Sequence, residues 1–106
     1  PFDLRDGEPL GERDVDNAYT DLERGEDRCW QVEVATDRLV SRVWGGPGLD
    51  WVQVFTGKAR DEGGAPGVAV EPLSCPADAY NTGTGLVRLE PGQTWTAQWG
   101  LEAQRV

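Results

Sequence analysis

Apolar and polar residues alternate along most of the 106-residue chain. In residues 28–35, RCWQVEVA, every second side chain from Trp30 to Val34 is apolar and the side chains between them are polar. This alternation is typical of a strand with one buried face. Residues 38–45, RLVSRVWG, repeat the pattern after polar residues at Thr36–Asp37, so the two segments predict a hairpin.

The same pattern predicts further strands and no amphipathic helix. Residues 50–57, DWVQVFTG, are apolar enough for a strand covered on both faces. A short apolar run from Val68 leads to Glu71, after which Pro72 and Pro76 are expected to end regular structure. The remaining predicted strands cover residues 16–22, 85–90 and 94–101, while residues 5–14 and 57–66 are predicted to be loops.

About seven short strands separated by turns indicate an all-β fold, most simply an antiparallel β-sandwich. A chain of this length has room for one domain with a modest core. Five tryptophans in so few residues suggest apolar surface that another segment would cover.

Charge and composition exclude several classes of partner. Nineteen acidic residues against ten basic ones give a net charge of −9, which repels nucleic acid and anionic membranes. The sequence contains no apolar run long enough to cross a bilayer and no signal region, so we expect a soluble, cytoplasmic protein. Cys29 and Cys75 are expected to be free thiols.

The chain begins at Pro1 and contains neither Met nor His, so we expect a fragment of a longer protein. Asp14 and Asp16 have the spacing of a calcium loop, but Ala18 stands where the next ligand is needed. We therefore expect no metal and no cofactor.

Glu71 and Gln53 are the two polar positions that carry candidate chemistry. At the end of an apolar run, Glu71 is either an ordinary solvated charge or a positioned proton acceptor. Gln53 stands among Trp51, Val52 and Val54 and is either an outward-facing strand residue or a ligand contact.

Four blocks of sequence, in this order, resemble the C-terminal part of an aldose 1-epimerase of the galactose mutarotase family. They are FDLRDGEPLG, VDNAYTDL, WVQVFTGK and VAVEPLSCPADAYNTGTGLVRLEPGQTWTAQWGL, and together they cover most of the chain. The resemblance implies a large antiparallel β-sandwich, of which residues 1–106 would be about the last third. The partner implied is then the missing N-terminal portion of the same domain, and the substrate is an aldohexose such as galactose or glucose.

The resemblance also implies roles for three residues. Glu71 matches the catalytic base that takes the proton from the anomeric hydroxyl, while Asp16 and Gln53 match residues that hydrogen-bond to the sugar. Asn17 stands where the family often has His or Asp. In the family a histidine protonates the ring oxygen, the ring opens, and reclosure exchanges the α and β anomers. Because this chain has no histidine, the resemblance implies that the acid lies upstream of Pro1.

Two other functions remain open from the sequence. One is a non-catalytic β-sandwich that binds carbohydrate or a partner and retains Asp16 and Gln53. The other is a hexose-phosphate epimerase, which would need cationic phosphate ligands. Arg88 and Lys58 are available for that role, but the sequence has no basic cluster.

Overall fold

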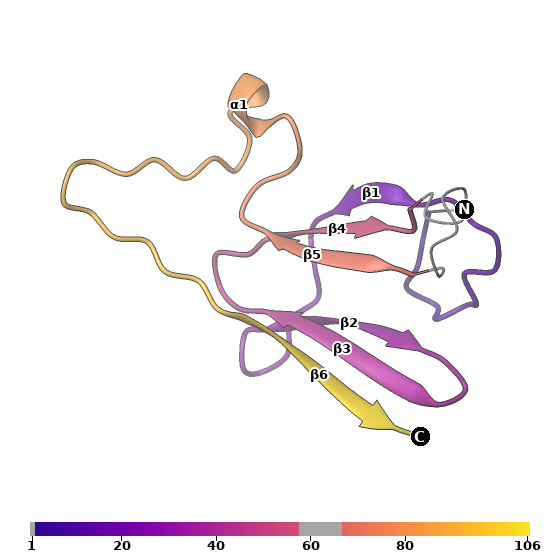
Figure 1. The fold of residues 1–106 in the computed structure, drawn as a ribbon. Coiled ribbons are helices and arrows are strands. Elements are labelled where there is room, and N and C mark those ends of the chain that lie inside the picture. The colour runs from indigo at the N-terminus through magenta and orange to yellow at the C-terminus, as the bar shows by residue number, and fades with distance from the viewer. Residues whose placement is uncertain (1, 58–66) are drawn as a thin grey trace.

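The computed structural model describes residues 2–57 and 67–106, which form two antiparallel three-stranded sheets and one short helix (Figure 1). The first sheet has the strand order β1-β4-β5 and the second has the order β2-β3-β6. The elements are β1 (Asp16–Tyr19), β2 (Trp30–Ala35), β3 (Leu39–Gly45), β4 (Trp51–Phe55), β5 (Ala69–Leu73), α1 (Ala79–Thr82) and β6 (Trp99–Arg105). The all-β class expected from the sequence is therefore confirmed, in a layered arrangement like that of a β-sandwich.

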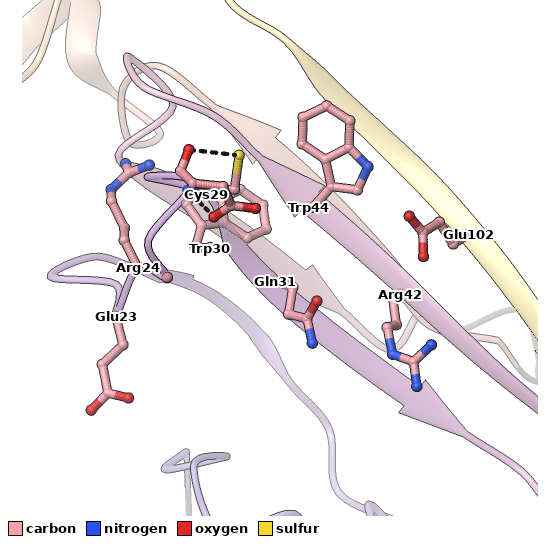
Figure 2. A pocket seen from close by; sticks show the side chains of 10 residues that line it. Glu23, Arg24, Cys29, Trp30, Gln31, Arg42, Trp44 and Glu102 are labelled. Carbon is pink, nitrogen blue, oxygen red and sulfur yellow. Dashed lines mark hydrogen bonds between the residues drawn. The ribbon is translucent and has the colours of Figure 1, made fainter.

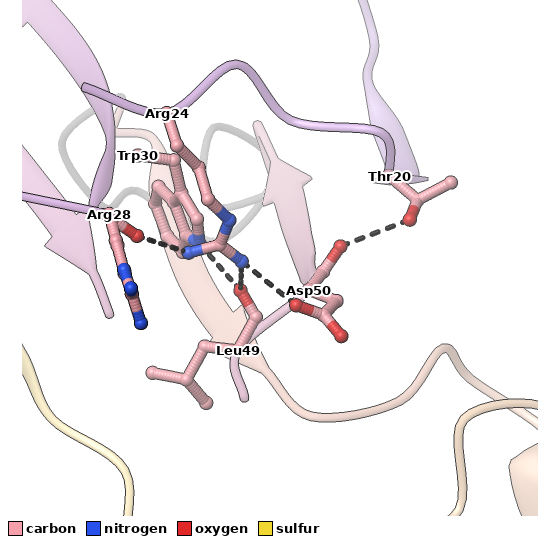
Figure 3. Close-up of polar contacts among 6 residues, drawn as sticks. All are labelled: Thr20, Arg24, Arg28, Trp30, Leu49 and Asp50. Carbon is pink, nitrogen blue, oxygen red and sulfur yellow. Dashed lines mark hydrogen bonds and ion pairs between the residues drawn. The ribbon is translucent and has the colours of Figure 1, made fainter. Parts of the chain in front are cut away.

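The chain passes between the two sheets three times, and one group of hydrogen bonds joins the first two passages (Figure 3). Arg24, in the β1–β2 connection, donates to the carbonyl oxygens of Arg28 (2.7 Å) and Leu49 (3.1 Å) and pairs with the Asp50 carboxylate at 2.8 Å. Thr20 donates to the Asp50 carbonyl oxygen at 3.0 Å. These bonds fix where β4 begins relative to the end of β1.

The buried core is small and comes from both sheets and their connections. The β2–β3 hairpin forms as predicted, with a turn closed by the bond from Thr36 N to the Leu39 carbonyl oxygen at 2.8 Å. Its register places Trp30, which is 2% exposed, directly opposite Gly45. The buried apolar residues are Val15, Trp30, Leu49, Val52, Val54 and Ala79.

The structure corrects four expectations about strands. Pro72 does not end β5 but lies inside it, because β5 is an edge strand where a missing N–H can face away from the sheet.

The strand expected over 16–22 ends at Tyr19, and Asp21 has a left-handed backbone (φ 54°). The strand expected over 50–57 is covered on one face only: Val52 and Val54 are buried, but Phe55 on the other face is 42% exposed.

The fourth correction concerns the segment between α1 and β6, which Figure 1 shows as a long excursion from the sheets. Residues 85–90 form no strand, and the strand expected over 94–101 begins only at Trp99. The reason is the length of β3, whose last residue, Gly45, pairs with Trp99, so earlier residues have no partner strand. Most of the loop expected over 57–66 lies outside the described residues.

We expect Gly45→Ala to lower the free energy of unfolding by about 1–3 kcal/mol, the range for overpacking a filled core. A Cβ atom on Gly45 would lie 2.4 Å from the Trp30 ring, which is itself buried. Gly67→Ala is the matched control, because its Cβ would have no neighbour within 4 Å among residues 2–57 and 67–106. Urea unfolding measures the free energy of unfolding of both variants. Equal values for the two would contradict the prediction that the Trp30 ring fills the space beside Gly45.

Candidate functional site

The three site residues expected from the sequence lie on one face of the β1-β4-β5 sheet. Gln53, on the central strand β4, is directly opposite Ala18 on β1 and Glu71 on β5. Asp16 lies two residues before Ala18 and so projects from the same face. Side chains directly opposite each other on neighbouring strands are close enough to act on one ligand.

A hydrogen bond joins two of the three. Gln53 Nε2 donates to Asp16 Oδ1 at 2.6 Å. An ionised carboxylate can only accept, which fixes the amide nitrogen toward Asp16 and leaves the amide oxygen free to accept from a ligand. Gln53 therefore has a set orientation, with a second N–H still available.

The start of β1 is held by Thr56, the residue directly after β4, which positions Asp16. The backbone N–H of Val15 donates to Thr56 Oγ1 at 3.0 Å, and Thr56 N donates back to the Val15 carbonyl oxygen at 2.9 Å. At the other end of β1, the Tyr19 hydroxyl donates to the Phe2 carbonyl oxygen at 2.7 Å. Partial burial, with a smaller effect of the Asp3 charge, raises the pKa of Tyr19.

The segment after β5 adds a wall to this face and makes it an open hollow of about 520 Å³. Asp78 has a left-handed backbone (φ 68°) and leads into α1, and Gly83, also left-handed, ends the helix by donating to the Ala79 carbonyl oxygen. The hollow is lined by Asp16, Gln53, Phe55, Glu71, Leu73, Cys75, Pro76, Ala77, Asp78, Ala79 and Tyr80.

The chemical character of the hollow is apolar with a few acidic and amide groups. Asp16, Glu71 and Asp78 supply three carboxylates, and the described lining contains no Lys or Arg. Glu71 itself is exposed, so bulk water reaches its carboxylate in this structure. Such a lining suits a neutral ligand with hydroxyl groups and repels an anionic one.

Sequence reasoning missed the two aromatic residues of the hollow. Phe55 lies in the strand expected to be covered on both faces, and the sequence gives no expectation for Tyr80, yet they are 42% and 94% exposed and both line the hollow. The sequence shows that Phe55 alternates with Gln53 and that Tyr80 follows Pro76. Neither feature shows that a side chain remains exposed.

Other site chemistry is not found in the described part of the chain. Across residues 2–57 and 67–106, no three His, Cys, Asp or Glu side chains gather closely enough to hold a metal ion. Cys29 and Cys75 are both free thiols. The same residues include no helix with the length and apolar character to span a bilayer.

Comparison with known proteins shows a similarity over part of the chain. The chain is 40% identical over 55 residues to the Escherichia coli (strain K12) protein named "Uncharacterized protein YihR". The matched stretch is 52% of this chain and 17% of that protein, so the chain spans less than a fifth of its relative's length. No protein-family model matches the sequence. No solved structure matches it either.

Proposed function

We propose that these residues form the base half and part of the sugar pocket of an aldose 1-epimerase, which interconverts the α and β anomers of a free aldohexose. The observation that carries the proposal is the meeting of Asp16, Gln53 and Glu71 on one face of one sheet. The sequence resemblance implies a role for the same three residues. They come from three different strands, and they line one hollow together.

Each residue has a defined part in the proposed reaction. Glu71 removes the proton of the C1 hydroxyl, which starts ring opening. Asp16 keeps acceptor positions for sugar hydroxyls after it has accepted the bond from Gln53. The free N–H and oxygen of the Gln53 amide can donate to one hydroxyl and accept from another.

The proton for the ring oxygen comes, in this proposal, from a group outside the 106 residues. The family's acid is a histidine, and this chain has none. The whole reaction therefore requires the natural gene product in which these residues stand.

The second candidate function is a carbohydrate-binding module without catalysis. The exposure of Glu71 and the absence of histidine favour it, because a base without an acid supports only half of the proton transfer. A hexose-phosphate epimerase is disfavoured, because the described lining has three carboxylates and no cation. Arg88 is not among the lining residues, and Lys58 lies outside the described part.

We expect D-galactose or D-glucose to shift the NMR signals of the Gln53 side-chain amide saturably. Asp16→Ala should weaken the affinity by about tenfold or more, the loss of one charge-assisted hydrogen bond, and it leaves the Gln53 amide in place as the readout. Gln104→Ala is the matched control, because this exposed amide lies on β6 in the other sheet. Unchanged Gln53 signals up to about 0.1 M of either sugar would contradict the sugar contact.

A further inference from the structure

The outer face of the β2-β3-β6 sheet carries a second hollow, separate from the site described above (Figure 2). Its volume is about 720 Å³, and it extends from the sheet to the β1–β2 connection. It shares no lining residue with the first hollow. The lining residues are Glu23, Arg24, Gly25, Asp27, Cys29, Trp30, Gln31, Arg42, Trp44 and Glu102.

Trp44 gives this hollow a flat apolar surface. Gln31, Trp44 and Gly100 are directly opposite one another across the three strands. A Cβ atom on Gly100 would lie 2.5–2.7 Å from Nε1, Cε2 and Cζ2 of Trp44, so the indole lies directly over the glycine backbone. Because Gly100 has no side chain, the Trp44 ring can lie against the sheet. Aromatic side chains often cover a glycine on a neighbouring strand in this way.

Polar side chains surround the ring on the same face. Glu33, Arg42 and Glu102 form the next cross-strand row, and Arg42 Nε donates to Glu33 at 3.1 Å. Gln31 is exposed beside the ring and offers both a donor and an acceptor. Figure 2 shows Gln31, Arg42 and Trp44 projecting from the two paired strands and Glu102 from the third.

The charges indicate what kind of ligand fits. Arg24 is paired with Asp50 and Arg42 with Glu33, so both guanidinium groups already have carboxylate partners. The remaining charged side chains of the lining are Glu23, Asp27 and Glu102, which repel phosphate and other anions. A quaternary ammonium ion is typically held in a cage of several rings, whereas of the two indoles in this lining Trp30 is buried and only Trp44 is accessible.

We propose that this hollow is a second carbohydrate site, in which the Trp44 indole stacks on the apolar face of a neutral pyranoside while Gln31 and Glu102 hydrogen-bond to its hydroxyls. A sugar ring combines one flat apolar face with a rim of hydroxyls, which matches an apolar surface bordered by a few polar groups. The proposal is independent of the epimerase function, because it uses other residues on the other sheet.

The test uses the natural gene product that contains these residues and methyl β-D-galactopyranoside, a glycoside whose blocked anomeric hydroxyl prevents anomer exchange. We expect the sugar to shift the NMR signals of the Trp44 indole N–H and the Gln31 side-chain amide saturably. Gln31→Ala and Gly100→Ala should each weaken the affinity by about tenfold or more, the second by displacing the ring from its place. Both substitutions leave the indole present, so the Trp44 signal remains as a readout.

Three comparisons make the result specific. The exposed Trp99 indole, on the opposite face of the same sheet, serves as the control and should not respond to the sugar. The Trp44 response should persist in Gln53→Ala, which separates this site from the first. A Trp44 signal that stays unchanged up to about 0.1 M sugar, or that responds to tetramethylammonium or inorganic phosphate instead, would overturn the proposal.

Discussion

We expect the replacement of Trp30 by alanine to lower the free energy of unfolding by about 3–5 kcal/mol, the range for truncating a large buried aromatic side chain. Trp30 is 2% exposed, and its indole N–H donates to the Leu49 carbonyl oxygen at 2.6 Å. Removing the ring opens a cavity beside Gly45 and breaks this bond between the second sheet and the segment leading into β4. The core is small, so this one residue carries a large share of it.

Urea unfolding followed by far-UV circular dichroism measures the effect without relying on the removed indole. Trp99→Ala is the matched control, because Trp30 and Trp99 flank Gly45 from the two neighbouring strands. Trp99 is 61% exposed, so its loss should cost less than about 1 kcal/mol. A Trp30→Ala chain that is unfolded without urea agrees with this account, whereas equal losses in the two variants would contradict it.

Local patterns predicted the fold well where the partner strand is a neighbour in sequence. Alternation from Trp30 to Val34 and a turn at Thr36 were enough to predict the β2–β3 hairpin, which the structure confirms. The start of β6 could not be predicted in this way. It depends on where β3 ends, and Gly45 lies 54 positions before its partner Trp99.

The sequence also does not show which faces of the individual strands are buried. The apolar residues around Gln53 predict a strand covered on both faces, but a hydrophobic pattern alone does not show whether a second layer is present. Pro72 predicts the end of a strand because proline disfavours central strands, and only the sheet order shows that β5 is an edge strand.

The candidate site was found through resemblance, and its geometry came from long-range pairing. Asp16 and Gln53 are 37 residues apart, and no local rule places their side chains at 2.6 Å. The register of β4 with β5 then sets Glu71 opposite Gln53. Phe55 and Tyr80 were missed because exposure of an aromatic residue is a property of the assembled surface.

The largest functional effect is expected at Glu71. Replacing its carboxylate by an amide of nearly equal size removes the proton acceptor while keeping hydrogen-bonding capacity. A positioned general base contributes a factor of about 10² to 10⁴ to a rate, so Glu71→Gln should lower anomer exchange by that factor. Sugar affinity should change by less than about tenfold, because Asp16 and Gln53 keep their contacts. Glu90→Gln, an exposed carboxylate that does not line the hollow, is the matched control.

Polarimetry of freshly dissolved α-D-galactose, with the natural gene product that contains these residues, tests the central claim most directly. We expect the unmodified protein and its Glu90→Gln variant to accelerate the approach to the anomeric equilibrium equally. The Glu71→Gln variant should fall about 10² to 10⁴-fold below them. Equal acceleration by the Glu71→Gln variant, or no acceleration by the unmodified protein, would contradict the assignment of Glu71 as the base of an aldose 1-epimerase.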